Sequence, residues 1–192
     1  MSELQKEELL LLEDGSWTEE ENLKPLEQIN GFSVRPGFYE MNGATAFPNG
    51  VNFTLITHSG TSCELVLFHR QQSVPYAVIP FPEKYRIGSV YSMFIFGLKI
   101  NEFEYAYRID GPNQPKQGLI FDKTKYLLDP YARAVTGQSA WGKKLSPGNF
   151  YKARVVHNNF DWGEENKTVI PLKDSIIYEL HVRGFTKSPS SG

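Results

Sequence analysis

The sequence predicts a mainly β protein built around an antiparallel β-sandwich. Apolar and polar residues alternate in short runs from about residue 50 to residue 110, a pattern typical of half-buried strands. Turn signals such as Asn49-Gly50 and Asp110-Gly111 separate the runs. Aromatic residues make up 14% of the chain, and eight of them fall between Phe81 and Tyr107. Such strands, rich in large apolar side chains, favour two packed sheets of about a hundred residues.

The strands of this sandwich are expected within residues 31–136. In each of them, every second residue is apolar and should face the space between the sheets. A weaker strand carries Pro75, which suggests the edge of a sheet because proline cannot donate a ladder hydrogen bond. The expected strands are centred on Val51–Leu55, Cys63–Leu67, Val74–Ile79, Tyr91–Ile95 and Phe103–Ile109.

The first thirty residues differ from the rest in charge. Residues 1–30 carry nine acidic and two basic residues, a balance of −7 within a chain whose net charge is −2. Ser2-x-x-Gln5 has the form of a helix-capping box, and Leu4, Leu11 and Leu12 share one helical face. We therefore expect an acidic helical extension over residues 1–30; a frayed acidic tail is the alternative.

The end of the chain predicts the start of another domain. Residues 137–170 have no regular pattern and are interpreted as a connecting segment. Ile176–Val182 is a dense apolar run of the kind found in parallel sheets, although Glu179 and His181 share one of its faces. Charged groups facing into a sheet suit the inside of a barrel, where neighbouring strands can pair with them. Residues 171–192 are therefore predicted to contain the first strand of a truncated (β/α)8 barrel.

Composition excludes several classes of function. The basic residues outside the extension are spread thinly, so nucleic-acid binding is not expected. No apolar run is long enough to span a bilayer, and the N-terminus has no signal-peptide pattern. The single cysteine, Cys63, excludes an internal disulfide. These observations predict a cytoplasmic protein without membrane or nucleic-acid partners.

Several motifs, in this order, resemble the N-terminal part of isoamylase-type glycogen debranching enzymes. These enzymes belong to the α-amylase family, glycoside hydrolase family thirteen. The resemblance implies that the sandwich is a carbohydrate-binding module of family forty-eight, with an immunoglobulin-like fold of the early-set type. It also implies a parent enzyme that hydrolyses α-1,6-glucosidic branch linkages in glycogen or limit dextrin. The motifs are Phe32–Gly37, Gly50–Phe53, Glu64–Phe68, Tyr105–Pro112, Lys125–Arg133 and Ile177–Thr186.

The same resemblance implies that no catalytic residue lies in this chain. The family's aspartate nucleophile, glutamate acid and second aspartate all lie on later barrel strands, so the chain alone should be inactive. No cofactor or metal is expected, because Glu179 and His181 share a face but no third ligand follows. The implied partners are the missing catalytic barrel of the same polypeptide and, weakly, an α-glucan such as glycogen or limit dextrin.

Carbohydrate-binding modules stack aromatic rings on the apolar faces of sugars. Tyr105, Tyr107 and Trp141 are the candidates for this role, with core or interdomain packing as the alternative for the two tyrosines. Tyr178, Glu179 and His181 are candidates for positions near the parent's substrate cleft, with structural pairing as the alternative for Glu179 and His181.

Two other interpretations of function stay open at this stage. The chain could be a stand-alone, non-catalytic glycogen-binding module. It could also be the N-terminal part of a glycogen branching enzyme, although Arg183–Thr186 resembles the debranching enzymes more closely.

Overall fold

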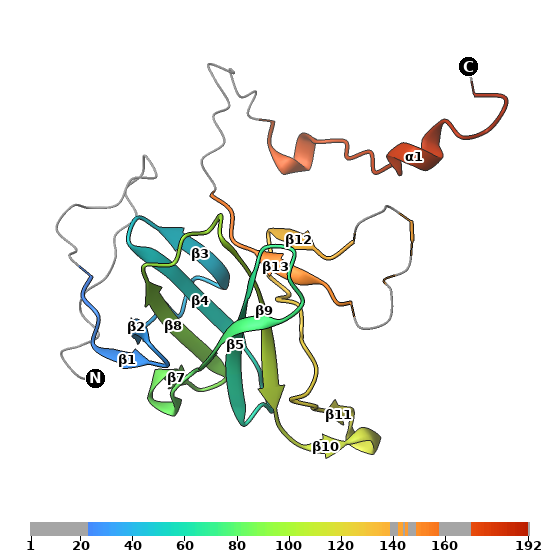
Figure 1. The fold of residues 1–192 in the computed structure, drawn as a ribbon. Helices are drawn as coiled ribbons and strands as arrows, with labels where there is room; N and C mark the ends of the chain where they lie inside the picture. The colour runs from blue at the N-terminus through green and yellow to red at the C-terminus, as the bar shows by residue number, and fades with distance from the viewer. Residues whose placement is uncertain (1–22, 139–141, 144, 146–148, 158–169, 192) are drawn as a thin grey trace. The chain divides into compact units, whose positions relative to one another are not determined.

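The computed structural model describes residues 23–138, 142–143, 145, 149–157 and 170–191 (Figure 1). The chain divides into two compact units, Met1–Asn158 and Asn159–Gly192, and each is described here by itself. The predicted helical extension falls largely on residues 1–22, which lie outside the described residues. At the end of that extension the prediction is wrong, because Glu27–Ile29 is a strand that pairs with Phe32–Val34.

The first unit is built on two antiparallel sheets, and the predicted mainly β, antiparallel architecture is confirmed. The order of the first sheet is β1-β2-β8-β4-β3, with β7 also paired to β8. The order of the second sheet is β12-β13-β9-β5-β6. The strands of the first sheet are β1 (Glu27–Ile29), β2 (Phe32–Pro36), β3 (Gly43–Phe47), β4 (Gly50–Ile56), β7 (Arg86–Ile87) and β8 (Val90–Phe96). Those of the second are β5 (Ser62–His69), β6 (Pro75–Pro80), β9 (Phe103–Asp110), β12 (Ala134–Thr136) and β13 (Lys152–Arg154).

The hydrophobic core lies between the two sheets, where the period-two alternation of the strands places it. Phe53 of β4 and Tyr105 of β9 meet across the core with ring centroids 5.3 Å apart in an edge-to-face arrangement. Burying an aromatic or large aliphatic side chain of this kind stabilises the fold by about 1.5–3 kcal/mol. The inward-facing set includes Val51, Leu55, Cys63, Leu65, Leu67, Tyr91, Met93, Ile95, Phe103, Tyr107 and Ile109.

The turn that joins β3 to β4 shows why a glycine stands at residue 50. The turn itself consists of Pro48 and Asn49, and Gly50 is the first residue of β4. A Cβ atom on Gly50 would lie 2.2 Å from the carbonyl oxygen of Ile95. Glycine therefore allows β4 to pair closely with β8 at this point.

Between β9 and β12 the chain forms a small hairpin and then an irregular stretch. β10 (Asn113–Gln114) pairs antiparallel with β11 (Leu119–Ile120), and the 3₁₀ turn Pro115–Gln117 joins them. Earlier in the chain, between β6 and β7, lies another 3₁₀ turn, Glu83–Tyr85. After the hairpin, Tyr107 and Leu127 form a single antiparallel bridge that ties the irregular stretch to β9.

The sandwich continues beyond residue 136, its predicted end. β13 lies in the segment interpreted as a connection, and it joins the second sheet through pairing of Ala153 with Tyr105. β12 then pairs with the outer side of β13. A three-residue strand carries too short an alternation to be recognised as part of the sandwich, and long-range pairing decides its place.

The second unit does not contain the predicted barrel strand. It has a 3₁₀ turn at Leu172–Asp174 and a short helix, α1 (Val182–Phe185), while residues 175–181 form no strand. Ile176 and Ile177 are 98% and 78% exposed. A strand of a parallel sheet needs hydrogen-bonded neighbours on its edges, and the described residues supply none here. Among the described residues, no helix is long and apolar enough to cross a membrane.

Candidate functional site

Tyr105 and Tyr107 are the first candidates to place, and both lie inside the sandwich. Each ring is 1% exposed, and their centroids are 5.8 Å apart in an edge-to-face pair. A sugar can stack only on a ring face that solvent reaches, so these tyrosines have no such role in this structure. The alternative considered from the sequence, core packing, describes them correctly.

A buried hydrogen bond explains why Tyr105 is a tyrosine. Its hydroxyl donates to Oδ2 of Asp129 at 2.7 Å, while Oδ1 of Asp129 accepts from the backbone N–H of Tyr131 at 2.8 Å. Burial raises the pKa of Asp129 above its ordinary value, and these two hydrogen bonds oppose the rise. Asp129 thus fastens the irregular stretch to β9, and a binding role does not follow.

The remaining candidates do not converge on a site in the described residues. Trp141 lies outside them. In the second unit Tyr178, Glu179 and His181 are all exposed. The Nδ1 atom of His181 accepts a hydrogen bond from the backbone N–H of Gly184 at 2.9 Å, which caps α1. No hydrogen bond, ion pair or ring contact joins the side chains of these three described residues to one another.

The outer face of the second sheet carries the polar groups that sequence reasoning missed. Side chains that point away from the core stand side by side on β5 and β9, in the cross-strand pairs Glu64–Arg108, Val66–Ala106 and Phe68–Glu104. The first pair is an ion pair with 2.8 Å between Arg108 Nη2 and Glu64 Oε2, and both side chains are about one-third exposed. This face is therefore polar at one end and apolar in the middle.

Three aromatic rings cover the apolar part of this face. Phe68 of β5 contacts Tyr126 and Phe150, with ring centroids 5.3 and 5.4 Å away, and Tyr126 lies 4.5 Å from Phe150. The ammonium group of Lys152 stands 5.3 Å from the Phe68 centroid and 5.8 Å from that of Phe150. Cation–π attraction of this kind contributes about 0.5–2 kcal/mol.

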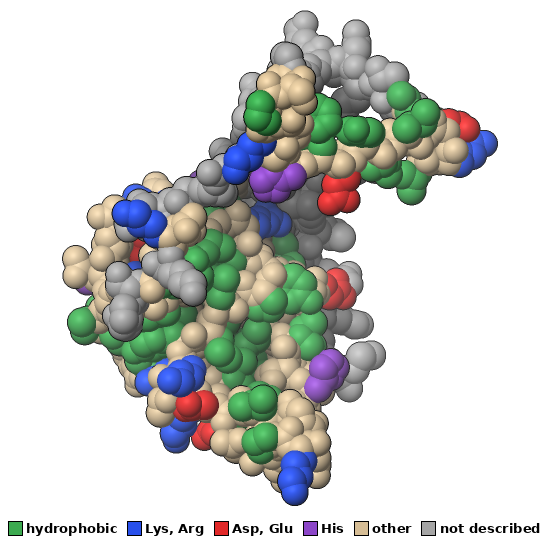
Figure 2. Space-filling view, turned by 90° about the vertical axis from the view of Figure 1, so that its right-hand side faces the viewer, with side chains coloured by type: hydrophobic (Ala, Val, Ile, Leu, Met, Phe, Trp, Pro, Cys, Tyr) green, Lys and Arg blue, Asp and Glu red, His purple; other side chains and the backbone are tan. Residues whose placement is uncertain are grey.

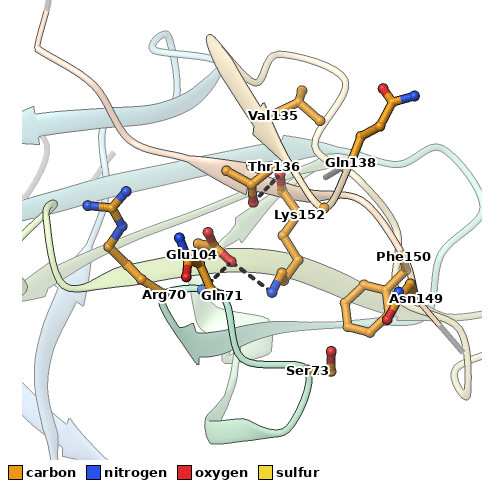
Figure 3. A pocket seen from close by; sticks show the side chains of 11 residues that line it. Arg70, Gln71, Ser73, Glu104, Val135, Thr136, Gln138, Asn149, Phe150 and Lys152 are labelled. Carbon is orange, nitrogen blue, oxygen red and sulfur yellow. Dashed lines mark hydrogen bonds and ion pairs between the residues drawn. The ribbon is translucent and has the colours of Figure 1, made fainter. Parts of the chain in front are cut away.

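A pocket of about 550 Å³ opens beside these rings (Figure 3). Its walls come from the β5–β6 loop, from β9, and from the segments around β12 and β13. Figure 3 shows Phe150 at one side of the pocket, and a dashed line marks the ion pair between Glu104 and Lys152. The lining residues are Arg70, Gln71, Ser73, Glu104, Val135, Thr136, Gly137, Gln138, Asn149, Phe150 and Lys152.

The donor set of the pocket suits a neutral, hydroxyl-rich ligand. Gln71, Gln138 and Asn149 carry amides that can donate and accept hydrogen bonds, and Ser73 adds a hydroxyl. Phe150, which is half-buried, lines the pocket next to these groups. A single aromatic surface beside several amides is the pairing that sugar recognition requires, and the volume lies within the range of small-molecule pockets, roughly 300–1,000 Å³.

The segment from β11 to β12 carries a second group of exposed side chains. Five large apolar side chains of this segment are exposed: Ile120, Leu127, Leu128, Tyr131 and Val135. Figure 2 shows hydrophobic side chains gathered on the side of the molecule that faces the viewer. Clustering of exposed apolar residues marks surfaces that pack against another protein segment.

Comparison with known proteins identifies the family of the sandwich. Residues 41–132 match the family model of carbohydrate-binding module 48, described as the isoamylase N-terminal domain. That segment of the chain matches this family, which confirms the resemblance found in the sequence motifs.

The relatives are consistent with this assignment. The chain is 32% identical to isoamylase 1 of Arabidopsis thaliana, a chloroplastic protein, over 88% of the chain and 22% of that protein. It is 35% identical to the glycogen debranching enzyme of Serratia proteamaculans over 80% of the chain and 24% of that enzyme. The apo pullulanase of Paenibacillus barengoltzii has the same fold, with a TM-score of 0.52 at 22% identity, covering 78% of this chain and 20% of that one. The chain thus spans less than a quarter of the length of these relatives.

Proposed function

We propose that the chain is the N-terminal part of an isoamylase-type debranching enzyme. The whole protein would hydrolyse α-1,6-glucosidic branch linkages in glycogen or limit dextrin. The support is the match to relatives named isoamylase and glycogen debranching enzyme, together with the family of the sandwich. Cytoplasmic location, predicted from the sequence, remains part of this proposal.

Within that enzyme this part would do two things. The apolar segment between residues 119 and 135 would pack against the catalytic barrel and hold the sandwich in place. The pocket beside Phe150 would bind α-glucan. The observation that carries this second role is the pocket itself, because it combines an aromatic face with amide side chains on a module of a carbohydrate-binding family.

The chemistry of the pocket predicts weak binding to the glucosyl units of an α-glucan. A glucosyl ring has apolar C–H faces and a rim of hydroxyls, so Phe150 would contact a face while Gln71, Gln138 and Asn149 bond the rim. Each exchange of a water hydrogen bond for a sugar hydrogen bond contributes only about 0.5–1.5 kcal/mol. The many equivalent glucosyl units of a glycogen particle would raise the apparent affinity only by increasing the concentration of binding sites.

Affinity electrophoresis in a gel containing glycogen tests this role. The chain should be retarded relative to its mobility without glycogen, and Phe150→Ala and Asn149→Ala should each weaken the retardation by about threefold to tenfold. Asn149 is exposed, so that variant should fold normally even if Phe150→Ala loosens the aromatic contacts.

Tyr151→Ala is the matched control for this experiment. Tyr151 is 39% exposed and adjacent in sequence, but it does not line the pocket, so its removal should leave retardation unchanged. Retardation that survives both pocket variants would place the glucan elsewhere. Trp141→Ala in the same gel tests the candidate that the described residues do not include.

A further inference from the structure

The β5–β6 loop, residues 70–73, forms one wall of the pocket, and its backbone is held from two distant strands. The Lys152 ammonium donates to the carbonyl oxygen of Gln72 at 2.5 Å. The Glu104 carboxylate, through Oε2, accepts from the backbone N–H of Gln71 at 3.3 Å. Both hydrogen bonds join the loop to residues far away in the sequence. The loop conformation therefore depends on tertiary contacts as well as on its own turn.

Glu104 and Lys152 also bond to each other. Their Oε2 and Nζ atoms lie 2.7 Å apart, and the side chains are 2% and 6% exposed. A buried ion pair is maintained only when further hydrogen bonds satisfy its charges, because desolvation otherwise exceeds the attraction. Here the loop backbone supplies those further bonds, so the ion pair and the loop conformation depend on each other.

The loop has a backbone conformation that needs such support. Gln71 has φ of 62°, in the left-handed region that non-glycine residues rarely adopt. A residue in this region keeps its conformation when the surrounding contacts determine it, and such positions concentrate at ligand sites. The N–H that Glu104 accepts from belongs to this same residue.

We propose that Glu104 and Lys152 are positioning residues that clamp residues 70–73 as a wall of the α-glucan pocket. We call this pair with its two loop bonds the loop clamp. It acts on the ligand through the loop, by holding Gln71 and Ser73 where they line the pocket. The inference rests on the proposed function for its ligand, but the clamp itself can be measured in the free protein.

The test replaces the whole ion pair, because removing one partner would leave a buried charge and could unfold the chain. In Glu104→Met/Lys152→Met both side chains keep their approximate volume and lose their charge, so the double variant should melt cooperatively. The matched control is Glu64→Met/Arg108→Met, which removes a different ion pair on the same sheet face without touching the loop.

The first readout is hydrogen exchange of peptides covering residues 69–75, measured by mass spectrometry without any sugar. The clamp variant should exchange about tenfold faster in this segment, while exchange in β4 and β8 is unchanged. The control double variant should exchange like the natural protein throughout. Unaltered exchange at residues 69–75 in the clamp variant would overturn the proposal.

The second readout is retardation in the glycogen gel, where the clamp variant should lose most of the retardation and the control variant should keep it. The single variant Lys152→Arg keeps a donor-rich cation beside Glu104. It should therefore be retarded more than the clamp variant, although less than the natural chain. If the natural chain is not retarded, the proposed glucan role fails and hydrogen exchange alone decides the clamp. If the natural chain and the clamp variant are equally retarded, glucan binding stands and the positioning role is refuted.

Discussion

Asp129 is a buried carboxyl group whose charge opposes folding. Burial raises its pKa, and the hydrogen bonds from Tyr105 and from the Tyr131 backbone only partly offset that cause. The folded protein therefore holds the Asp129 proton more tightly than the unfolded chain does. By linkage, stability is greatest below the unfolded-state pKa and falls as pH rises through the higher folded-state pKa.

Asp129→Asn should remove this pH dependence. An asparagine can keep both contacts, with its carbonyl oxygen accepting from the Tyr131 N–H and its amide donating to the Tyr105 hydroxyl. The free energy of unfolding of the variant, relative to the natural protein, should rise between about pH 3 and about pH 7. Urea denaturation at several pH values measures this difference.

The exposed Asp122 provides a control of opposite sign. Hydrogen bonds from the Thr124 side chain and backbone lower the pKa of Asp122, so its contribution to stability is present above its unfolded-state pKa and lost as pH falls. Asp122→Asn should thus lose stability relative to the natural protein as pH rises. Equal slopes for the two variants would contradict the environment assigned to Asp129.

Among the structural elements, the loop of residues 37–42 depends on polar groups from the first sheet. Asn52 of β4 accepts from the Phe38 backbone N–H at 2.8 Å and donates to Thr54 Oγ1 at 3.1 Å. The hydroxyls of Thr54 and Ser92 lie 2.7 Å apart, and Thr54 also donates to the Phe38 carbonyl. Asn52, Thr54 and Ser92 are fully buried, so this hydrogen-bonded network satisfies polar groups that water does not reach.

Asn52→Ala should destabilise the sandwich by about 1–3 kcal/mol, because the Phe38 N–H and the Thr54 hydroxyl lose buried partners. Asn101→Ala removes the same amide from an exposed turn and should change stability by less than about 0.5 kcal/mol. Chemical denaturation of both variants measures the comparison. Similar effects from the two substitutions would mean that the Asn52 network contributes little.

The sequence predicted those elements whose side chains carry their own pattern. Val51, Phe53 and Leu55 alternate over a complete strand, so both β4 and its inward face could be predicted. The short strand around Ala153 could not be placed in the sandwich, because its position depends on pairing with Tyr105 far away in sequence. The run Ile176–Val182 has strand composition, but composition does not supply the neighbouring strands that a parallel sheet requires.

The candidate site was less predictable than the fold for a related reason. Tyr105 and Tyr107 were singled out because they are aromatic, although they share the alternating pattern of the apolar residues of their strand, and that pattern favours the core packing considered as the alternative. Glu104 and Lys152 meet only after β9 and β13 have become neighbours. Gln71 was not identified because nothing in a local Gln-Gln pair signals a left-handed backbone.

At the scale of the whole molecule, the division near Asn158 separates the sandwich from the segment that follows. All paired strands of both sheets lie in the first unit, so its core does not require residues 159–192. The exposed apolar residues of the second unit, among them Ile176 and Tyr178, are surfaces of the kind that another segment of the proposed enzyme would cover.

Deletion of residues 159–192 should leave a folded sandwich. We expect one cooperative thermal transition, shifted by no more than about 2–4 °C from that of the full chain. Circular dichroism and calorimetry measure the transition. Loss of cooperativity would mean that the second unit contributes to the core of the first. A chain without Lys152–Val155 serves as the opposite control, because Ala153 and Val155 are core residues whose loss should abolish the transition.

Labelling of the Cys63 thiol can report how often the β-sandwich opens. It is the only cysteine in the sequence, it is 1% exposed in the core, and burial raises the pKa of its thiol. A thiol reagent in solution can therefore react only after the two sheets separate. The labelling rate then counts the rare openings of the sandwich in native buffer, without an introduced probe, and the same measurement could rank every variant above by how often its sheets part.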